Sequence, residues 1–509
     1  MKETILKGGI ILVIAGIVGK ILGALYRIPL SNILGAEGIG LYQMISPVFS
    51  LALIICSGGV SVTIAHTVAK IRASGVGSIR DVFLKGFFYT LFTSLFFALL
   101  FFILGDKIAE LQGNALAGAG YKICALALVF SSLLASFRGL FQGFQNMSPT
   151  ATSQILEQVF KVAFGLVLAY FFARTSLELG VVGAFLGITV AEIISFFYLF
   201  FRAKTFNFGV FLIKKDKNPF FKANFIITSG YLIIPLLTAF DSFVVINLLT
   251  KTFPSSLSTS LYGLQSGMVN SLINFPVVVS VATSLAILPT LTFFLTQNNR
   301  EKASEVVSKI FTVLLLFLLP CVLIFVFFAS DILNFIYSSL GESLLETASL
   351  LLQISAFQIL FISILQICTA VFQSLDKPIL PIVFMSVAGA FKILTTIVLV
   401  NMPSINIYGL AISNLLFYAV AGVLSLVYVK KHLPFALKTK VLLVASTSLG
   451  VLASSFALIN VYTSAFWVKI FLIGASLALF YMLPLLVFDL FEIKNTLKQK
   501  ILKWRTRNE

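Results

Sequence analysis

The sequence has 509 residues, of which 59% are hydrophobic and only 11% charged, with a formal net charge of +17. Soluble domains carry about 25% charged residues, so this chain has too little polar surface to enclose a water-soluble core, which argues against a soluble enzyme. The positive charge would suit a nucleic-acid partner, but only the positions of the charges can decide that. The length divides better into membrane spans of about 20 residues each.

Fourteen apolar stretches, separated by charged or turn residues, predict an all-α polytopic membrane protein. The first stretch follows a short basic start and has no small-residue cleavage site, so we interpret it as a retained span. Breaks at Gly58 and Gly59, and at Pro276 and Pro289, predict that the second helix of each half is interrupted, as happens beside protein or a wet cavity. In chain order the stretches are 8–34, 38–57, 83–104, 115–137, 150–172, 180–201, 223–249, 261–280, 304–328, 347–372, 379–400, 407–429, 441–462 and 466–488.

The basic residues fall on alternate connections. With the N-terminus in the cytoplasm, 27 Lys and Arg residues lie in inner segments, five in outer loops and four within spans, which accounts for all 36. This bias predicts a cell-membrane protein with both termini cytoplasmic, and it removes the case for a nucleic-acid partner. No phosphate-binding or dinucleotide-binding motif is found, so we expect neither a cofactor nor an enzymatic activity. The cysteines lie within apolar runs, without the paired spacing of a disulfide framework or metal site: Cys56, Cys124, Cys321 and Cys368.

A weak internal repeat relates the two halves of the chain. Phe141 matches Phe372, and Lys161 matches Lys392, both at an offset of 231 residues. Six spans separate each pair, so the halves have the same orientation and form a parallel repeat, as in transporters with a site between two bundles. The domains expected are an N-lobe (1–202, spans 1–6), a basic cytoplasmic linker (203–222), a C-lobe (223–430, spans 7–12), spans 13 and 14 (431–490) and a basic cytoplasmic tail (491–509).

Basic residues inside the predicted spans are candidates for binding an anion, because charge in a membrane is costly and normally faces the bundle interior. Counting helix rise from the cytoplasmic ends puts Lys20, Lys161 and Lys392 each roughly 18–20 Å deep, where they are expected to converge on one cavity. Arg27 lies two turns after Lys20 and either joins this site or reaches the outer headgroups. Lys392 has no acid within four residues on its helix and is the strongest single candidate.

Three acidic residues inside spans have a structural and a functional interpretation. Glu157 precedes Lys161 by four residues, the favourable order for an intrahelical ion pair, and ligand binding by this pair is also open. Asp241 either pairs with a lysine of the other lobe or is protonated, in which case it is a candidate ion-coupling residue. Glu192 has the same two interpretations. The eighth span also carries three amides that either bridge helices or hydrogen-bond sugar hydroxyls: Gln265, Asn270 and Asn274.

Two segments carry motifs of a known family. The first has LKG at 6–8, KILG at 20–23, YR at 26–27 and ILGAEGIGLY at 33–42; the second has RGLFQGFQNMSPT at 138–150, SQ at 153–154 and EQ at 157–158. Both resemble the polysaccharide transporter family of the multidrug/oligosaccharidyl-lipid/polysaccharide flippase superfamily, which includes lipid II flippases. The resemblance implies two six-helix lobes in a V and a central cavity that opens alternately to each side. It also implies that Lys20 and Arg27 bind a pyrophosphate, and that the helices of 441–488 form a groove for a lipid tail.

We therefore expect a flippase that moves an undecaprenyl-pyrophosphate-linked oligosaccharide, lipid II or a related cell-wall precursor, across the cytoplasmic membrane by alternating access. Its partners would be this glycolipid and membrane lipids, and its energy would come from an ion gradient or the membrane potential. One alternative is a cation-coupled multidrug antiporter of the same superfamily, in which Asp241 or Glu192 carries the ion. Another is a non-transporting scaffold for cell-wall or spore-cortex synthesis that docks synthesis proteins through its basic tail.

Overall fold

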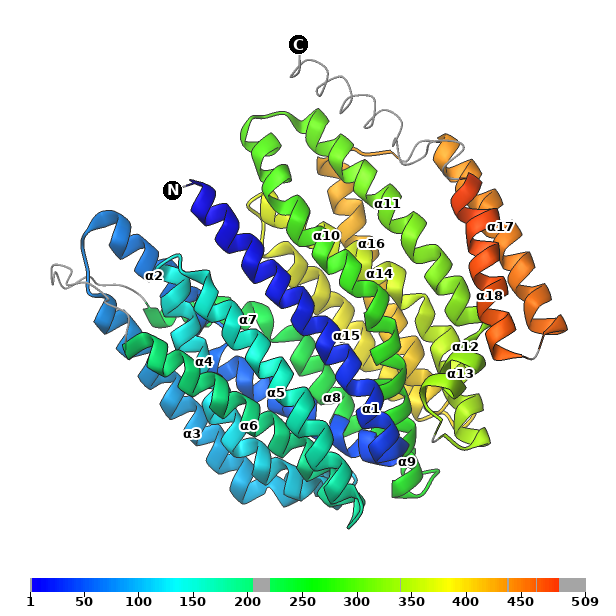
Figure 1. Cartoon of the computed structure of the whole chain (residues 1–509), viewed down its shortest axis with the longest axis horizontal. Helices are drawn as coiled ribbons and strands as arrows, with labels where there is room; N and C mark the ends of the chain where they lie inside the picture. The colour runs from blue at the N-terminus through cyan, green and yellow to red at the C-terminus, as the bar shows by residue number, and fades with distance from the viewer. Residues whose placement is uncertain (1, 205–219, 339, 437–438, 464, 485–509) are drawn as a thin grey trace. The chain divides into compact units, whose positions relative to one another are not determined.

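A computed structural model describes residues 2–204, 220–338, 340–436, 439–463 and 465–484, and its elements are all helices (Figure 1). Most of the predicted linker and the whole tail (491–509) lie outside these residues. Within them, 11 helices are long and apolar enough to cross a membrane, or up to 12 when the bent pair α7 (Phe220–Tyr231) and α8 (Ile233–Leu249) counts as one span. The all-helical polytopic fold is confirmed, and fourteen spans are consistent with it.

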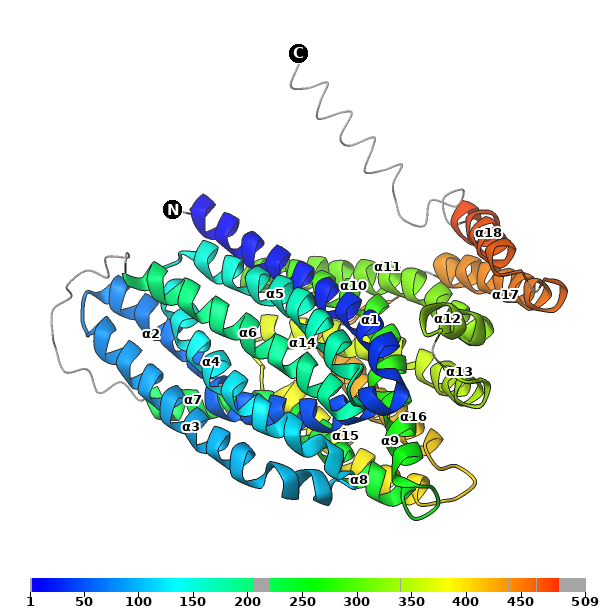
Figure 2. The same cartoon turned by 60° about the horizontal axis from the view of Figure 1, so that its bottom comes forward.

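The first half of the chain begins with a helix that contains two predicted spans. Helix α1 (Lys2–Ser57) is kinked at Gly35, whose φ of 66° and ψ of −175° suit a residue without a side chain. The bend is visible in Figures 1 and 2, and it separates the predicted spans 8–34 and 38–57. The helices that follow are α2 (Val60–Ser74), α3 (Ile79–Leu111), α4 (Gly118–Gly143), α5 (Met147–Ala173) and α6 (Leu177–Lys204).

The predicted helix breaks have different outcomes in the two halves. The break at Gly58 and Gly59 is confirmed, because α1 ends before it and α2 starts after it. The break at Pro276 and Pro289 is wrong: α10 (Asn270–Thr296) runs through both prolines, which membrane helices tolerate when neighbouring groups satisfy the freed backbone. The irregularity lies earlier, in the π-helix η2 (Leu264–Val269) that follows α9 (Ser255–Gly263). The remaining helices are α11 (Arg300–Phe327), α12 (Ala329–Ile336), α13 (Glu342–Ala356), α14 (Gln358–Ser374), α15 (Leu380–Val400), α16 (Tyr408–His432), α17 (Thr439–Tyr462), α18 (Phe466–Ser476) and the π-helix η3 (Leu477–Met482).

The chain packs as two compact units. Unit 1 comprises Met1–Val278, Ile336–Leu344 and Ile382–Phe417, and unit 2 comprises Val279–Phe335, Leu345–Pro381 and Tyr418–Glu509. Unit 1 therefore joins α7, α8, α9 and α15 to the first six helices. These units are defined by packing within one structure. The predicted lobes 1–202 and 223–430 are instead defined by motion against each other, so the lobe division stays a prediction.

Close helix packing in unit 1 depends on small residues. Helices α5 and α6 touch backbone to backbone, because a Cβ added at Gly187 would overlap Gly165. Helices α1 and α9 meet in the same way, since a Cβ at Gly40 would overlap the backbone of Thr259. In lipid there is no hydrophobic driving force between helices, so small residues stabilise such contacts by allowing close van der Waals packing of the backbones.

In unit 2 the C-terminal helices α17 and α18 pack against α11 and α12, which confirms that two further helices follow the twelfth predicted span. Their buried core includes Leu316, Phe328 and Phe456. The hydroxyl of Tyr481 donates to the carbonyl of Leu316 at 2.7 Å. The pair is buried and ties η3 to α11.

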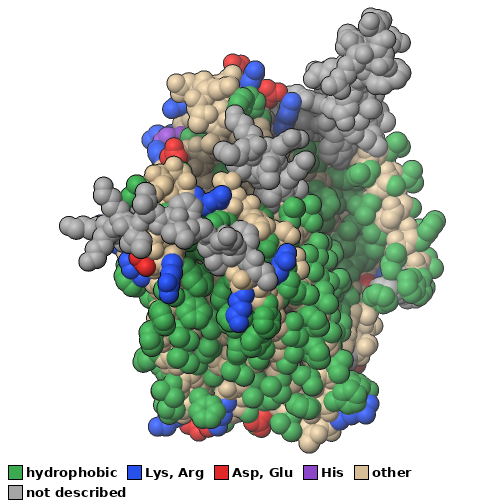
Figure 3. Space-filling model, turned by 60° about the vertical axis from the view of Figure 1, so that its left-hand side comes forward, with side chains coloured by type: hydrophobic (Ala, Val, Ile, Leu, Met, Phe, Trp, Pro, Cys, Tyr) green, Lys and Arg blue, Asp and Glu red, His purple; other side chains and the backbone are tan. Residues whose placement is uncertain are grey.

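The surface of the described residues has the distribution of a membrane protein. Figure 3 shows a face where hydrophobic side chains form a broad band, with Lys and Arg gathered toward its two ends. Helix α3 exposes aromatic side chains in this way: Phe92, Phe96 and Phe102 are 66%, 61% and 60% exposed. Such exposure is unfavourable in water and normal against acyl chains.

Candidate functional site

The polar centre of the first six helices is built on the helical hairpin of α4 and α5. Gln145, with a φ of 61°, turns the chain between the two helices, and Pro149 occupies the first turn of α5. Arg138 and Ser153 lie about equally far from this turn, and Glu157 lies one turn further along α5, within reach of the long Arg138 side chain. A guanidinium N–H of Arg138 donates to Glu157 at 2.7 Å, and its Nε donates to the hydroxyl of Ser153 at 3.0 Å. The ion pair is sheltered, with side chains 18% and 20% exposed.

The hairpin of α5 and α6 brings Glu192 to the same level. Glu192 is 8% exposed, and its Oε2 atom has no hydrogen-bond partner among the described residues. Glu157, Arg138 and Lys161 all lie within electrostatic range of this carboxylate. Arg138 and the two carboxylates therefore form one partly buried cluster, in which Lys161 has the weakest of the three interactions with Glu192.

A second group of residues surrounds Tyr26 of α1. The hydroxyl of Tyr26 packs against Gly165 of α5, where an added Cβ would lie 2.8 Å from it. Lys161 lies one turn earlier on α5, and its Nζ is 5.3 Å from the centre of the Tyr26 ring, within cation–π range. The Tyr26 residue is 1% exposed, and among the described residues its hydroxyl has no hydrogen-bond partner. Arg27 follows directly and is half-buried.

The charges around Tyr26 differ from those predicted. Of the two interpretations of Glu157, the ion pair with Lys161 is not formed, because Arg138 of the neighbouring helix pairs with Glu157 instead. Within the described chain, neither Lys161 nor Arg27 has a carboxylate at ion-pair distance. Lys20 lies on α1, but its side chain is outside the described residues. Its convergence with Lys161 and Lys392 stays a prediction.

A separate buried ion pair joins α8 and α15. Gly389 allows the two helices to approach, since a Cβ there would be 3.0 Å from the side chain of Leu237. One turn along, Nζ of Lys392 donates to Oδ2 of Asp241 at 2.6 Å, and the side chains are 4% and 8% exposed. The ammonium also lies 5.9 Å from the centre of the Phe417 ring. Lys392 is therefore not an uncompensated cation, and Asp241 pairs with a lysine of its own predicted lobe rather than of the other.

The three predicted amides lie at the irregular helix η2 and the start of α10. Gln265 is fully buried and its amide donates to Oδ1 of Asn270 at 3.3 Å, so these two support the helix locally. Asn274 is exposed. Gln43 of α1 was not predicted as a site residue, and its amide donates to the carbonyl of Ser266 at 2.8 Å. This contact connects the first half of the chain to η2.

The structure brings some predicted residues together and adds others. Lys161 lies over the ring of Tyr26, which Arg27 follows on α1; Glu157 lies near Glu192, and Asp241 pairs with Lys392. Arg138 and Tyr26 were missed as site residues. Across the described ranges, no group of three or more His, Cys, Asp or Glu residues is arranged to hold a metal ion.

Apolar helices that enclose buried ion pairs define a multi-pass membrane protein, and the comparisons place it among transporters. Residues 5–294, more than half of the chain, match the model of the family described as polysaccharide biosynthesis protein. The chain belongs to this family. Residues 230–398 also match the MatE family model.

Two proteins of Bacillus subtilis (strain 168) are homologous to the chain along most of its length. Stage V sporulation protein B is 28% identical over 454 residues, which cover 86% of each protein. Lipid II flippase MurJ is 24% identical over 493 residues, covering 89% of this chain and 88% of MurJ. The family resemblance inferred from the sequence motifs is thus confirmed.

Solved structures show the same fold. Lipid II flippase MurJ in an inward closed conformation aligns with a TM-score of 0.73 at 17% identity, covering 95% of this chain and all of MurJ. An inward-facing multidrug resistance MATE family transporter aligns with a TM-score of 0.68 at 13% identity, covering 81% of this chain and 94% of the other. The chain therefore has the fold of membrane flippases and transporters.

Proposed function

We propose that this chain flips an undecaprenyl-pyrophosphate-linked oligosaccharide, lipid II or a related cell-wall precursor, across the cytoplasmic membrane by alternating access. The observation that supports an anionic substrate is the pair of cations beside Tyr26. Among the described residues, Arg27 and Lys161 lack carboxylate partners although both lie on membrane-spanning helices. Charges in such positions are costly and are normally compensated, so a diphosphate is a fitting counter-ion.

The groups around Tyr26 have complementary roles in holding a diphosphate. The guanidinium of Arg27 offers a planar fork that matches phosphate oxygens, and the ammonium of Lys161 adds a compact charge. The hydroxyl of Tyr26 is buried and unpartnered within the described chain, and we propose that it becomes a third donor in the conformation that opens this site. Neutralising the headgroup here lowers the cost of removing it from water. Lys20 is proposed as a further ligand by family resemblance.

Energy coupling is proposed at Glu192. When a proton or a small cation neutralises Glu192, Lys161 loses a nearby counter-charge and binds the diphosphate more tightly. By linkage, the bound diphosphate favours uptake of that cation to the same extent. Asp241 is a weaker coupling candidate, because Lys392 already compensates its charge at 2.6 Å.

The test is flipping of a fluorescent undecaprenyl-diphosphate sugar by the full chain in proteoliposomes. A charge-assisted hydrogen bond contributes about 1.5–3 kcal/mol, so Lys161→Met is expected to slow flipping roughly 10-fold to 100-fold. Lys122→Met is the matched control, since this lysine is 39% exposed and pairs with Asp106. Unchanged flipping in Lys161→Met would refute the assignment.

The same vesicles separate the two alternatives. A multidrug antiporter should move a cationic dye, lose that activity in Glu192→Gln and keep it in Lys161→Met. A scaffold should move neither substrate and should be indifferent to both changes.

A further inference from the structure

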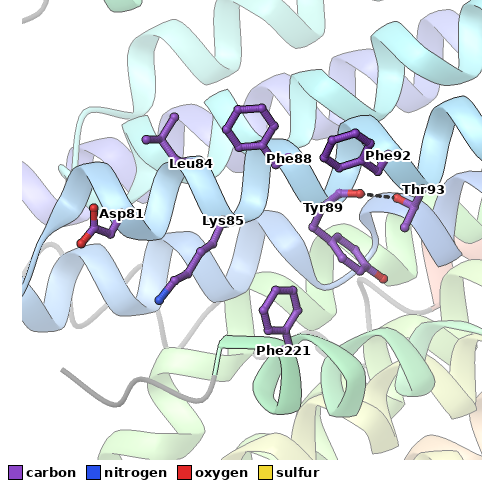
Figure 4. A pocket seen from close by; sticks show the side chains of 8 residues that line it. All are labelled: Asp81, Leu84, Lys85, Phe88, Tyr89, Phe92, Thr93 and Phe221. Carbon is purple, nitrogen blue, oxygen red and sulfur yellow. Dashed lines mark hydrogen bonds between the residues drawn. The ribbon is translucent and has the colours of Figure 1, made fainter. Parts of the chain in front are cut away.

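A pocket on unit 1 lies outside the charged cluster and the Tyr26 site. It is formed between α3 and α7 and has a volume of about 540 Å³ (Figure 4). Helix α3 supplies most of the lining, and Phe221 of α7 closes the opposite side. The lining residues are Asp81, Leu84, Lys85, Phe88, Tyr89, Phe92, Thr93 and Phe221.

The pocket has a polar end and an apolar end because its α3 residues share one helix face. Asp81, Lys85, Phe88 and Phe92 follow the spacing of successive turns. The polar pair lies in the first two turns of α3, where the side chain of Ser78 accepts from the backbone N–H of Asp81 and fixes the helix start. From Asp81 to Phe92 the helix rises about 16 Å, close to the ~15 Å hydrocarbon depth of one bilayer leaflet. The dimensions therefore suit one lipid acyl chain.

The apolar end has a fixed inner wall and an open outer side. Tyr89 is held by its hydroxyl, which donates to the carbonyl of Ile55 at 3.2 Å, and its ring meets Phe221 edge to face at 6.2 Å. Phe88, Phe92 and Phe221 are 46%, 66% and 60% exposed. These rings offer hydrocarbon contact on the membrane-facing surface, which suits an acyl chain entering sideways from the bilayer.

The polar end carries one charge of each sign. Asp81 and Lys85 lie one turn apart, both are exposed, and in the described structure no ion pair joins them. Opposite charges left open beside an apolar slot complement a zwitterionic headgroup, in which Lys85 meets the phosphate and Asp81 meets a cation. A primary ammonium donates hydrogen bonds to a carboxylate, whereas a quaternary one cannot. An anionic headgroup without a cation would instead be repelled by Asp81.

We infer that this pocket binds a diacyl phospholipid whose headgroup carries a primary ammonium, of the phosphatidylethanolamine type. The basic-residue bias places the start of α3 at the cytoplasmic face, so the lipid comes from the inner leaflet. One wall belongs to the predicted N-lobe, and Phe221 of the other wall lies at the end of the predicted linker, on the helix that continues into the predicted C-lobe. A lipid that contacts both helices therefore stabilises the arrangement in which α3 and α7 lie together.

Native mass spectrometry of the full-length protein tests this inference with added dioleoyl phosphatidylethanolamine, phosphatidylcholine or phosphatidylglycerol. The wild type is expected to prefer the ethanolamine lipid about tenfold over the other two. Asp81→Asn should abolish the preference over phosphatidylcholine, and Lys85→Gln should weaken all three lipids. Equal retention of the three lipids by the wild type, or an unchanged preference in Asp81→Asn, would overturn the assignment.

A second pocket, in unit 2, provides the matched control. It has a volume of about 430 Å³ and is lined by apolar residues with Lys430 but no acid. Lys430→Gln removes a lysine of similar setting and should leave the ethanolamine preference unchanged. If Lys430→Gln loses the preference for the ethanolamine lipid as Asp81→Asn does, the preference comes from general surface charge. That result would overturn the α3–α7 site.

Discussion

Removing one member of the ion pair between α8 and α15 is expected to destabilise the protein strongly. The pair joins Asp241 to Lys392 at 2.6 Å, with side chains only 8% and 4% exposed. At an effective dielectric constant of ~20 the attraction over this distance is roughly 6 kcal/mol, most of which offsets the desolvation of the two charges. Asp241→Asn leaves the ammonium buried without a counter-charge. The expected loss in the free energy of unfolding is about 3–5 kcal/mol.

The assay is equilibrium unfolding of the full chain in mixed micelles of a mild and a denaturing detergent. The matched control is Asp106→Asn, which breaks a pair with Lys122 of the same 2.6 Å separation but with side chains 59% and 39% exposed. An exposed pair contributes less than about 1 kcal/mol, so this control should be nearly neutral. The double variant Asp241→Leu with Lys392→Met removes both charges. It should recover most of the stability that Asp241→Leu alone or Lys392→Met alone loses.

Two results would refute this reasoning. If Asp241→Asn costs no more than Asp106→Asn, burial does not set the strength of the pair. If the double variant loses as much as the sum of the single changes, the two side chains are not energetically coupled.

Further predictions concern packing and one hydrogen bond. Gly187→Ala should cost about 1–3 kcal/mol of unfolding free energy in the same micelles, because the new methyl overlaps Gly165. The control Gly450→Ala adds a methyl that meets nothing within 4 Å, so it should be neutral or slightly stabilising. Equal losses of stability in the two variants would contradict the close contact of Gly187 with Gly165. Tyr481→Phe should cost about 1 kcal/mol by loss of the 2.7 Å hydrogen bond to Leu316. A neutral Tyr481→Phe would show that this bond adds nothing to the packing of η3 on α11.

The membrane helices were predictable because a bilayer accepts few alternatives to an apolar helix. The break after α1 was also predictable, since the paired glycines Gly58 and Gly59 stop a helix by a local effect. The prolines of α10 were misleading, because the effect of a proline within a membrane depends on neighbouring groups that are distant in sequence. The π-helix η2 has no comparable local signal and was missed.

The charged partners were harder to predict than the helices. Helix periodicity relates residues three or four apart, so it suggested Glu157 with Lys161 and gave no information on Arg138 from another helix. Asp241 and Lys392 are 151 positions apart, and only tertiary packing through Gly389 brings them together. The residue types were therefore identified as important, whereas their pairing required coordinates.

The kink at Gly35 has a consequence for biogenesis. It joins the first two predicted crossings with no polar loop between them, since helix continues on both sides of that residue. A translocon that released the first crossing alone would leave the interrupted helix backbone at Gly35 in lipid, so we expect the two crossings to leave the translocon together as one hairpin. An epitope inserted at this position should therefore abolish integration of the nascent chain, whereas one placed in a longer connection should be tolerated.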